Sequence, residues 1–174
     1  GLTMSTRFGP LLQNGFAVHD WQAAAEHWID VMGVGPFFVM RNIEFEWCNF
    51  RGEPADLDLT VAIAYSGGQQ IELVQQHNDA PSIYTEFLAN NEPGLQHMGM
   101  FVDDLQATLD ERDLRSRIVQ EGRTAAGVNF AYVDTVFLNG TMIELIEVDD
   151  AIRGAFGHMR VAAEGWDGSD PIRG

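Results

Sequence analysis

The stretch "PLLQNGFAVHDWQAAA" (10–25) returns later in the chain, in altered form, as "GLQHMGMFVDDLQATL" (94–109). When Gln13 is aligned with His97, Gly15 meets Gly99 and Asp20 meets Asp104, an offset of 97 − 13 = 84 residues. Both stretches read as an apolar strand, an acidic residue and then an amphipathic helix. An internal repeat constrains the fold of the whole chain, so we align the remaining segments of the two halves in the same way.

A second pair of segments extends the repeat. The segment "QQIELVQQ" (69–76) resembles "TMIELIEV" (141–148), with Glu72 opposite Glu144. This offset is 144 − 72 = 72 residues, so the first half carries 84 − 72 = 12 additional residues. They fall around "EWCNFRGEPADLD" (46–58), between two predicted strands.

Each half therefore predicts the same order of elements: one strand, one helix and three further strands. Asp20 and Asp104 are the predicted N-caps of the two helices. Turn-forming residues occur at 66–68 and 139–140. We predict strands at 13–18, 37–47, 58–66 and 69–76 in the first half, and at 97–102, 116–121, 129–137 and 141–148 in the second.

This pattern predicts an α+β fold in which two pseudo-symmetric βαβββ modules form a curled mixed sheet with a central cleft. Residues 1–9 are an N-terminal segment, and residues 1–3, before Met4, read as a cloning remnant. The folded domain spans 10–148, and the tail 149–174 is expected to pack on the outside. Within the domain we predict module one at 10–78, a linker helix at 79–93 and module two at 94–148.

Composition excludes several functions. The formal net charge is −16, and all ten basic residues are Arg. Such a surface repels nucleic acid, and the absence of Lys excludes Schiff-base chemistry. No apolar run is long enough to span a membrane, so no membrane partner is expected. A single cysteine, Cys48, indicates a reducing, cytoplasmic setting.

Two carboxylates occupy equivalent places in the repeat. Glu72 lies between Ile71 and Leu73, and Glu144 is flanked in the same way. If the apolar neighbours pack under the helices, strand alternation turns both carboxylates to the opposite face of the sheet. Burial of two carboxylates is costly unless they share a cation.

Together, Gln13, Glu72, His97 and Glu144 offer three oxygen ligands and one imidazole. This set suits a divalent ion in octahedral geometry with positions left for water or substrate, and it does not suit a closed structural zinc site. Each residue alone also fits a structural role: His97 as a core histidine, Gln13 as a hydrogen-bonding amide, and either glutamate as a solvated edge residue.

These residues and the motifs "QNGFAVHDWQAAAEHW", "GVGPF", "QQIELVQ" and "MIELIEV" resemble the vicinal oxygen chelate superfamily, also called the glyoxalase, bleomycin-resistance and dioxygenase fold. The resemblance covers about 10–148. In that family the ligands come from the first and last strands of paired βαβββ modules. By resemblance, Gln13, Glu72, His97 and Glu144 fall on these positions, as in glyoxalase I, and Glu144 is the better candidate base with Glu72 its partner.

The resemblance implies a metal-dependent lyase or isomerase that abstracts a proton next to a carbonyl of a small oxo or hydroxy substrate. The expected cofactor is a divalent ion, Zn, Ni, Co or Mn. Iron is less favoured, because Gln13 stands where the family's extradiol dioxygenases have histidine. The alternatives are a non-catalytic binding protein, an acyl-CoA epimerase and an extradiol dioxygenase. Modules of this family often pair across chains, which implies a homodimer.

Four aromatic residues on predicted strands are candidates for the pocket wall: Phe38, Trp47, Phe130 and Tyr132. Only Arg41, Arg51 and Arg123 lie where they could grip an anionic substrate. With a net charge of −16 and no Lys, a polyanion such as coenzyme A is less favoured.

Overall fold

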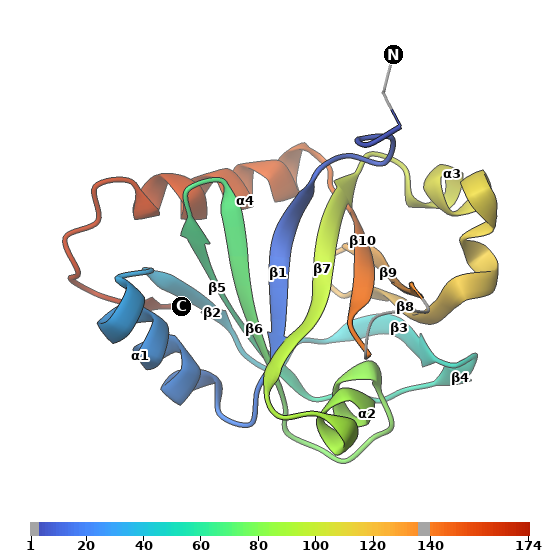
Figure 1. The fold of residues 1–174 in the computed structure, drawn as a ribbon, viewed down its shortest axis with the longest axis horizontal. Helices are drawn as coiled ribbons and strands as arrows, with labels where there is room; N and C mark the ends of the chain where they lie inside the picture. The colour runs from blue at the N-terminus through green and yellow to red at the C-terminus, as the bar shows by residue number, and fades with distance from the viewer. Residues whose placement is uncertain (1–3, 136–139) are drawn as a thin grey trace.

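One curled, open sheet organises the chain in this computed structural model, which describes residues 4–135 and 140–174 (Figure 1). Within these residues, eleven strands form the sheet in the order β11-β2-β5-β6-β1-β7-β10-β9-β8-β3-β4. The strands of module one are β1 Leu11–Ala17, β2 Phe37–Met40, β3 Phe45–Phe50, β4 Glu53–Pro54, β5 Leu59–Ser66 and β6 Gln69–Gln76. Those of module two are β7 Gly94–Val102, β8 Ile118–Thr124, β9 Asn129–Asp134 and β10 Met142–Glu147, and β11 Ile172–Arg173 comes from the tail.

The two modules meet at the antiparallel pair β1 and β7, in the middle of the sheet. The pairing is reciprocal: Gln13 lies opposite Gly99, and Gly15 lies opposite His97. Outside this pair, β1 runs parallel to β6 and β7 runs parallel to β10. This reciprocity is a pseudo-twofold relation between the modules, and it confirms the predicted fold class.

Helix α1 Trp21–Met32 begins at the predicted cap, because the Asp20 carboxylate accepts hydrogen bonds from the backbone N–H groups of Gln22 and Ala23. It ends at Gly33, whose φ of 67° is the left-handed conformation of a helix C-cap. Helix α3 Leu105–Asp110 is capped by Asp104 in the same way. It is short, because the chain continues as two 3₁₀ turns, Glu111–Asp113 and Arg115–Arg117, with Asp113 at a positive φ of 56°. The linker contains helix α2 Ile83–Asn90, which begins at Ser82.

The predicted strand 37–47 is in fact two strands, β2 and β3. The break lies at Asn42, whose φ of 52° is left-handed and incompatible with a continuous strand. After the break, β3 and β4 leave module one and extend the far edge of module two, where β3 pairs with β8. The twelve additional residues of the first half therefore link the two modules. The turn predicted at 66–68 is present, with Gly67 at a φ of 59°, whereas Asn139 of the second turn lies outside the described residues.

The tail is more ordered than the sequence suggested. Residues Asp150–Ala163 form helix α4, which Figure 1 shows running from the end of β10 toward the side of β5 and β2. Beyond it, β11 pairs with β2 and so adds a strand to the sheet. The indole of Trp166 packs on the backbone of Gly35, where a Cβ atom would lie 2.7 Å from the ring. The tail is thus attached to module one.

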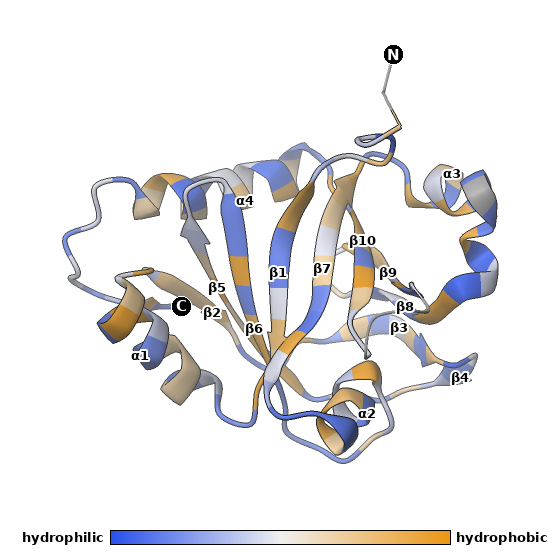
Figure 2. Ribbon diagram, viewed as in Figure 1, coloured by the Kyte–Doolittle hydropathy of each residue, from blue (hydrophilic) through white to orange (hydrophobic). Residues whose placement is uncertain are grey.

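The two faces of the sheet have different neighbours. On one face, α1 covers a cluster that includes Ile71 and Leu73, and α3 covers an equivalent cluster that includes Leu145. The other face carries most of the larger cluster, which α2 and α4 complete. Figure 2 shows hydrophilic positions interrupting the central strands β1, β6 and β7. Within the described parts of the chain, no helix is long and apolar enough to cross a membrane.

Candidate metal and active site

The four predicted ligand residues lie on four neighbouring strands at the centre of the sheet. Glu72 is on β6, Gln13 on β1, His97 on β7 and Glu144 on β10. Glu72 pairs with Gly15 across β6 and β1, and Glu144 pairs with Gly99 across β10 and β7. The repeat therefore brings together residues that are as far as 144 − 13 = 131 positions apart.

A β-bulge precedes the first site residue of each module, Gln13 in β1 and His97 in β7. Pairing between β1 and β7 shifts register just before Gln13, and it shifts again at Gln96, just before His97. Such bulges redirect a side chain on an otherwise regular strand. They let Gln96 and His97 both be buried although they are adjacent on one strand.

Gly15 and Gly99 make room for these side chains. A Cβ atom on Gly15 would lie 2.0 Å from Cε1 of His97, and one on Gly99 would lie 2.6 Å from Oε1 of Gln13. Each glycine therefore accommodates the polar side chain of the other module. This explains why the repeat keeps both a glycine and a polar residue in each strand.

We expect Gly15→Ala to displace the His97 ring and to reduce metal binding. Overpacking of this kind destabilises a fold by about 1–3 kcal/mol. Gly154→Ala is the control, because a Cβ atom there meets no atom within 4 Å. Metal titration and urea unfolding of both variants check the prediction, and unchanged metal affinity in Gly15→Ala would contradict it.

The ligand-type atoms converge on Nε2 of His97. This nitrogen lies 3.0 Å from Oε1 of Gln13, 3.1 Å from Oε1 of Glu72 and 3.4 Å from Oε1 of Glu144. One candidate ligand atom each from Glu72, His97 and Glu144 lies within 4.8 Å of the others. His97 and Gln13 are buried, and both glutamates are largely buried.

The hydrogen bonds of His97 define which nitrogen is free. Nδ1 lies 2.7 Å from Oε1 of Gln96, and an amide oxygen only accepts, so Nδ1 carries the proton. Nε2 then presents its lone pair to three acceptor oxygens. Four electron-rich atoms face one another in a buried place, and such an arrangement is stabilised either by a proton shared within the cluster or by a cation between them.

A divalent cation fits this arrangement. At bond lengths of about 2.1 Å, adjacent ligands of an octahedral ion lie about 3.0 Å apart. The separations of 3.0, 3.1 and 3.4 Å from Nε2 are close to that value. Glu72, His97 and Glu144 therefore form a group able to hold a metal ion.

Outer partners orient the four residues. Nε2 of Gln13 donates to Oε1 of Gln70 at 2.7 Å, which leaves Oε1 of Gln13 directed at His97. Gln70 in turn donates to the hydroxyl of Tyr65 at 2.9 Å. Sequence reasoning missed Gln70 and Gln96, although each is the polar residue that precedes a site residue in "QQIEL" or "LQHM". Such partners fix ligand orientation in metal sites.

Glu144 has the most perturbed environment of the group. Burial and the neighbouring charge of Glu72 raise the pKa of the Glu144 carboxyl well above its ordinary value of 4.5, while a hydrogen bond from Tyr132 lowers it. The Tyr132 and Tyr84 hydroxyls lie 2.8 Å apart. Burial raises the pKa of both tyrosines well above the ordinary value, so both remain protonated donors. Tyr84, on α2, gave no signal in the sequence.

The raised pKa of Glu144 predicts a pH dependence of stability in the metal-free protein. A carboxyl with a raised folded pKa contributes stability that is present below the ordinary pKa of 4.5 and is lost as the pH rises through the folded pKa. We expect the metal-free wild type to lose stability relative to Glu144→Gln as the pH rises above 4.5. Urea unfolding of both proteins in a chelator measures this, and parallel curves for the two proteins would contradict it.

The site opens into an apolar cavity of about 370 Å³. Gln13, Glu72, Glu144, Tyr84 and Tyr132 supply polar groups to its wall. Most of the remaining lining is aliphatic or aromatic and comes from both modules and from α4, including Met40, Val61, Ile63, Phe130, Ile146, Ile152, Phe156 and Met159.

Two of the four predicted pocket aromatics line this cavity, Phe130 and Tyr132. Phe38 instead faces the tail, with its ring 5.7 Å from that of His158 and below the guanidinium of Arg173. Trp47 is 44% exposed and lies at a separate surface hollow along β3. The tail therefore covers Phe38, whereas Trp47 lies on β3, which after the break at Asn42 pairs with β8 at the edge of module two.

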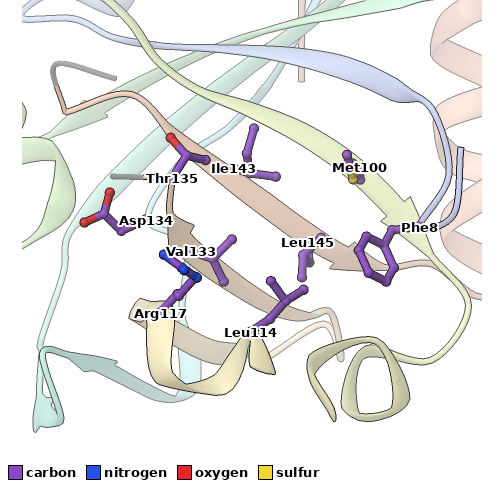
Figure 3. Close-up of a pocket in the computed structure, with 9 residues that line it drawn as sticks. All are labelled: Phe8, Met100, Leu114, Arg117, Val133, Asp134, Thr135, Ile143 and Leu145. Carbon is purple, nitrogen blue, oxygen red and sulfur yellow. The ribbon is translucent and has the colours of Figure 1, made fainter. Parts of the chain in front are cut away.

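A further hollow lies on the opposite face of module two, beside α3 (Figure 3). Ile143 and Leu145 of β10 point into it, together with Met100, Val133 and Phe8. Glu144, between these two residues, lines the cavity on the other face. The alternation that we predicted for β10 therefore holds, and it separates the carboxylate from the helix-covered face.

Residues 12–132 match the family model described as the Glyoxalase/Bleomycin resistance protein/Dioxygenase superfamily. The match covers well over half of the chain, and the protein belongs to this superfamily. A comparison with curated proteins finds no significant match.

Solved structures share the fold. The methylmalonyl-CoA epimerase of Mycobacterium tuberculosis is 24% identical with a TM-score of 0.58, over 88% of this chain and 97% of that one. A hypothetical protein of Bacillus halodurans is 16% identical with a TM-score of 0.59, over 81% and 95%. A variant methylmalonyl-CoA epimerase of Streptomyces coelicolor in complex with 2-nitronate-propionyl-CoA is 17% identical with a TM-score of 0.53, over 80% and 94%.

Proposed function

We propose that the protein is a metal-dependent isomerase or lyase that abstracts a proton next to the carbonyl of a small oxo or hydroxy substrate. The observation that carries the proposal is the convergence of three oxygens on Nε2 of His97, beside an apolar cavity. The structural neighbours named methylmalonyl-CoA epimerase support an isomerase on this fold.

The residues that would hold the ion are Gln13, Glu72, His97 and Glu144. Their three oxygens and one imidazole favour Zn, Ni, Co or Mn. A bound ion would act as a Lewis acid that polarises the carbonyl of the substrate.

Side chains of the protein carry out the proton transfer, hold the base in place and exclude water. Glu144 accepts the proton, because its carboxylate lines the cavity beside His97 and so faces a bound substrate. Tyr132 donates to Glu144 and keeps it in place. Glu72 also lines the cavity, and if Glu72 starts protonated and delivers its own proton to the opposite face of the substrate, while Glu144 keeps the abstracted proton, the product is an epimer. The apolar lining excludes water that would compete for the proton.

Proton abstraction can be tested without knowledge of the natural substrate. Purified protein is incubated in D₂O with hemithioacetals of 2-oxoaldehydes, acyl-CoA epimers and uncharged ketones, and deuterium gain at the carbon next to the carbonyl is followed by NMR. The proposal predicts enzyme-dependent exchange with at least one compound, abolished by a chelator and restored by metal. Exchange that persists in full in the chelator would refute metal dependence.

The apolar lining favours a second candidate, a protein that binds a small apolar molecule without turnover. In that case the four residues would be organised by hydrogen bonds alone. Metal-free protein that binds apolar ligands and catalyses no exchange would support this candidate.

A further inference from the structure

Helix α4 forms one wall of the cavity, and its residues lie outside the repeat. Ile152, Phe156, Met159 and Ala163 recur at spacings of four, three and four residues, as on one face of a helix. Three of them, with Ala151 and Ala155, line the cavity. No residue of α4 is fully buried, which is expected of a helix whose apolar face meets a cavity rather than close-packed side chains.

The helix is fixed to both modules. On the side of module two, the Phe156 ring stacks on Phe101 at 5.2 Å, and Arg153 pairs with Asp103 at 2.6 Å. On the side of module one, His158 meets Phe38, and β11 then joins β2. These contacts hold α4 in place as one wall of the cavity.

The cavity offers no counter-charge to an anionic substrate. None of the described residues that line it is an arginine, and the chain has no lysine. The three arginines considered above are engaged elsewhere. Arg51 pairs with Glu86, Arg123 pairs with Glu46, and Arg41 lies over the Trp21 ring. Among the described residues of the wall, the ionisable carboxyls are those of Glu72 and Glu144, whose negative charge a divalent ion would neutralise.

The volume bounds the part of an occupant that the cavity itself encloses. An apolar cavity of about 150 Å³ is sufficient for benzene. The 370 Å³ present here therefore suits an enclosed group of roughly two fused rings or a branched chain of similar bulk.

From these observations we infer that the substrate is a compact, uncharged, apolar carbonyl compound, selected by α4, rather than a phosphorylated thioester. The inference rests on the proposed function, because only an enzyme has a substrate. The binding selectivity that it predicts can be measured separately, without turnover. Ala155 and Phe156 act as specificity-determining residues on the wall that α4 supplies.

The test compares 2-tetralone, an uncharged bicyclic ketone, with 2-naphthoate, an anion of similar size, by calorimetry on metal-loaded full-length protein. We expect 2-tetralone to bind at least tenfold more tightly. Ala155→Phe fills the cavity from α4 and should weaken 2-tetralone binding at least tenfold without changing metal content. Val161→Phe, at a position on α4 that is 55% exposed and does not line the cavity, is the matched control and should bind normally.

Equal or tighter binding of 2-naphthoate would overturn the inference, as would normal 2-tetralone binding in Ala155→Phe. Deuterium exchange separates this inference from the proposed function. Selective binding of 2-tetralone without exchange of any compound would refute the enzyme while the selectivity stands. Exchange confined to acyl-CoA compounds would support the enzyme and overturn the substrate class.

If Ala155→Phe fails to fold, Met159→Ala provides a second test, because it enlarges the cavity. This variant should still bind 2-tetralone, and it should bind a bulkier tricyclic ketone more tightly than the wild type does. No gain in affinity for the tricyclic ketone would count against the inference.

Discussion

Glu144→Gln is expected to lower proton exchange roughly 10²–10⁴-fold, the usual contribution of a general base, while most of the metal is retained. The amide keeps the size of the side chain and one coordinating oxygen, but it cannot accept the proton. Exchange rates measured at saturating metal, together with metal content, check this. Glu53→Gln, the same chemical change at an exposed position on β4, should leave both quantities unchanged.

If Glu144 is only a ligand, the loss of activity will follow metal occupancy and excess metal will restore it. That outcome would move the role of base to Glu72, the other carboxylate in the cavity wall. Glu72→Gln would then show the loss expected here for Glu144→Gln.

His97→Ala is expected to lose the metal altogether at concentrations that saturate the wild type. The substitution removes the only nitrogen ligand, on which the three oxygens converge. Loss of an outer partner alone weakens metal binding about 10–100-fold, so loss of this ligand should exceed about 100-fold. Titration with a competing chelator measures the change.

Gln13→Ala should be the mildest substitution in the set, because a neutral amide contributes least to the field at the cation. A Gln13→Ala variant that loses metal as readily as His97→Ala would contradict the assignment of the four positions. It would favour the binding-protein alternative, in which hydrogen bonds organise the cluster.

The repeat made the centre of the site predictable. Aligning Gln13 with His97 and Glu72 with Glu144 placed four polar residues on two equivalent pairs of strands, and the structure brings them together. The alternation of Ile143, Glu144 and Leu145 was also readable, because one face of β10 packs on apolar residues. These features depend on local periodicity, which a sequence carries directly.

Features that depend on pairing across strands could not be predicted in this way. The fit of His97 against Gly15 becomes visible only once β1 and β7 are in register. The crossing of β3 to the edge of module two follows from the break at Asn42, which strand propensity alone does not reveal.

The sequence of the tail contains apolar residues at helical spacing. The spacing of Ile152, Phe156 and Met159 is helical, but the glycines within 150–163 and the Gly-, Asp- and Pro-rich segment after it suggested an irregular surface tail. Helix α4 lines the cavity, so the tail also supplies the wall that we assign to substrate selection, a role that the sequence analysis did not predict.

Elemental analysis of protein purified without a chelator tests the central claim most directly. The account predicts about one equivalent of a divalent transition metal per chain in the wild type, and almost none in His97→Ala purified in parallel. A folded wild type that contains no metal, and takes up none when Zn, Ni, Co and Mn salts are supplied, would contradict it.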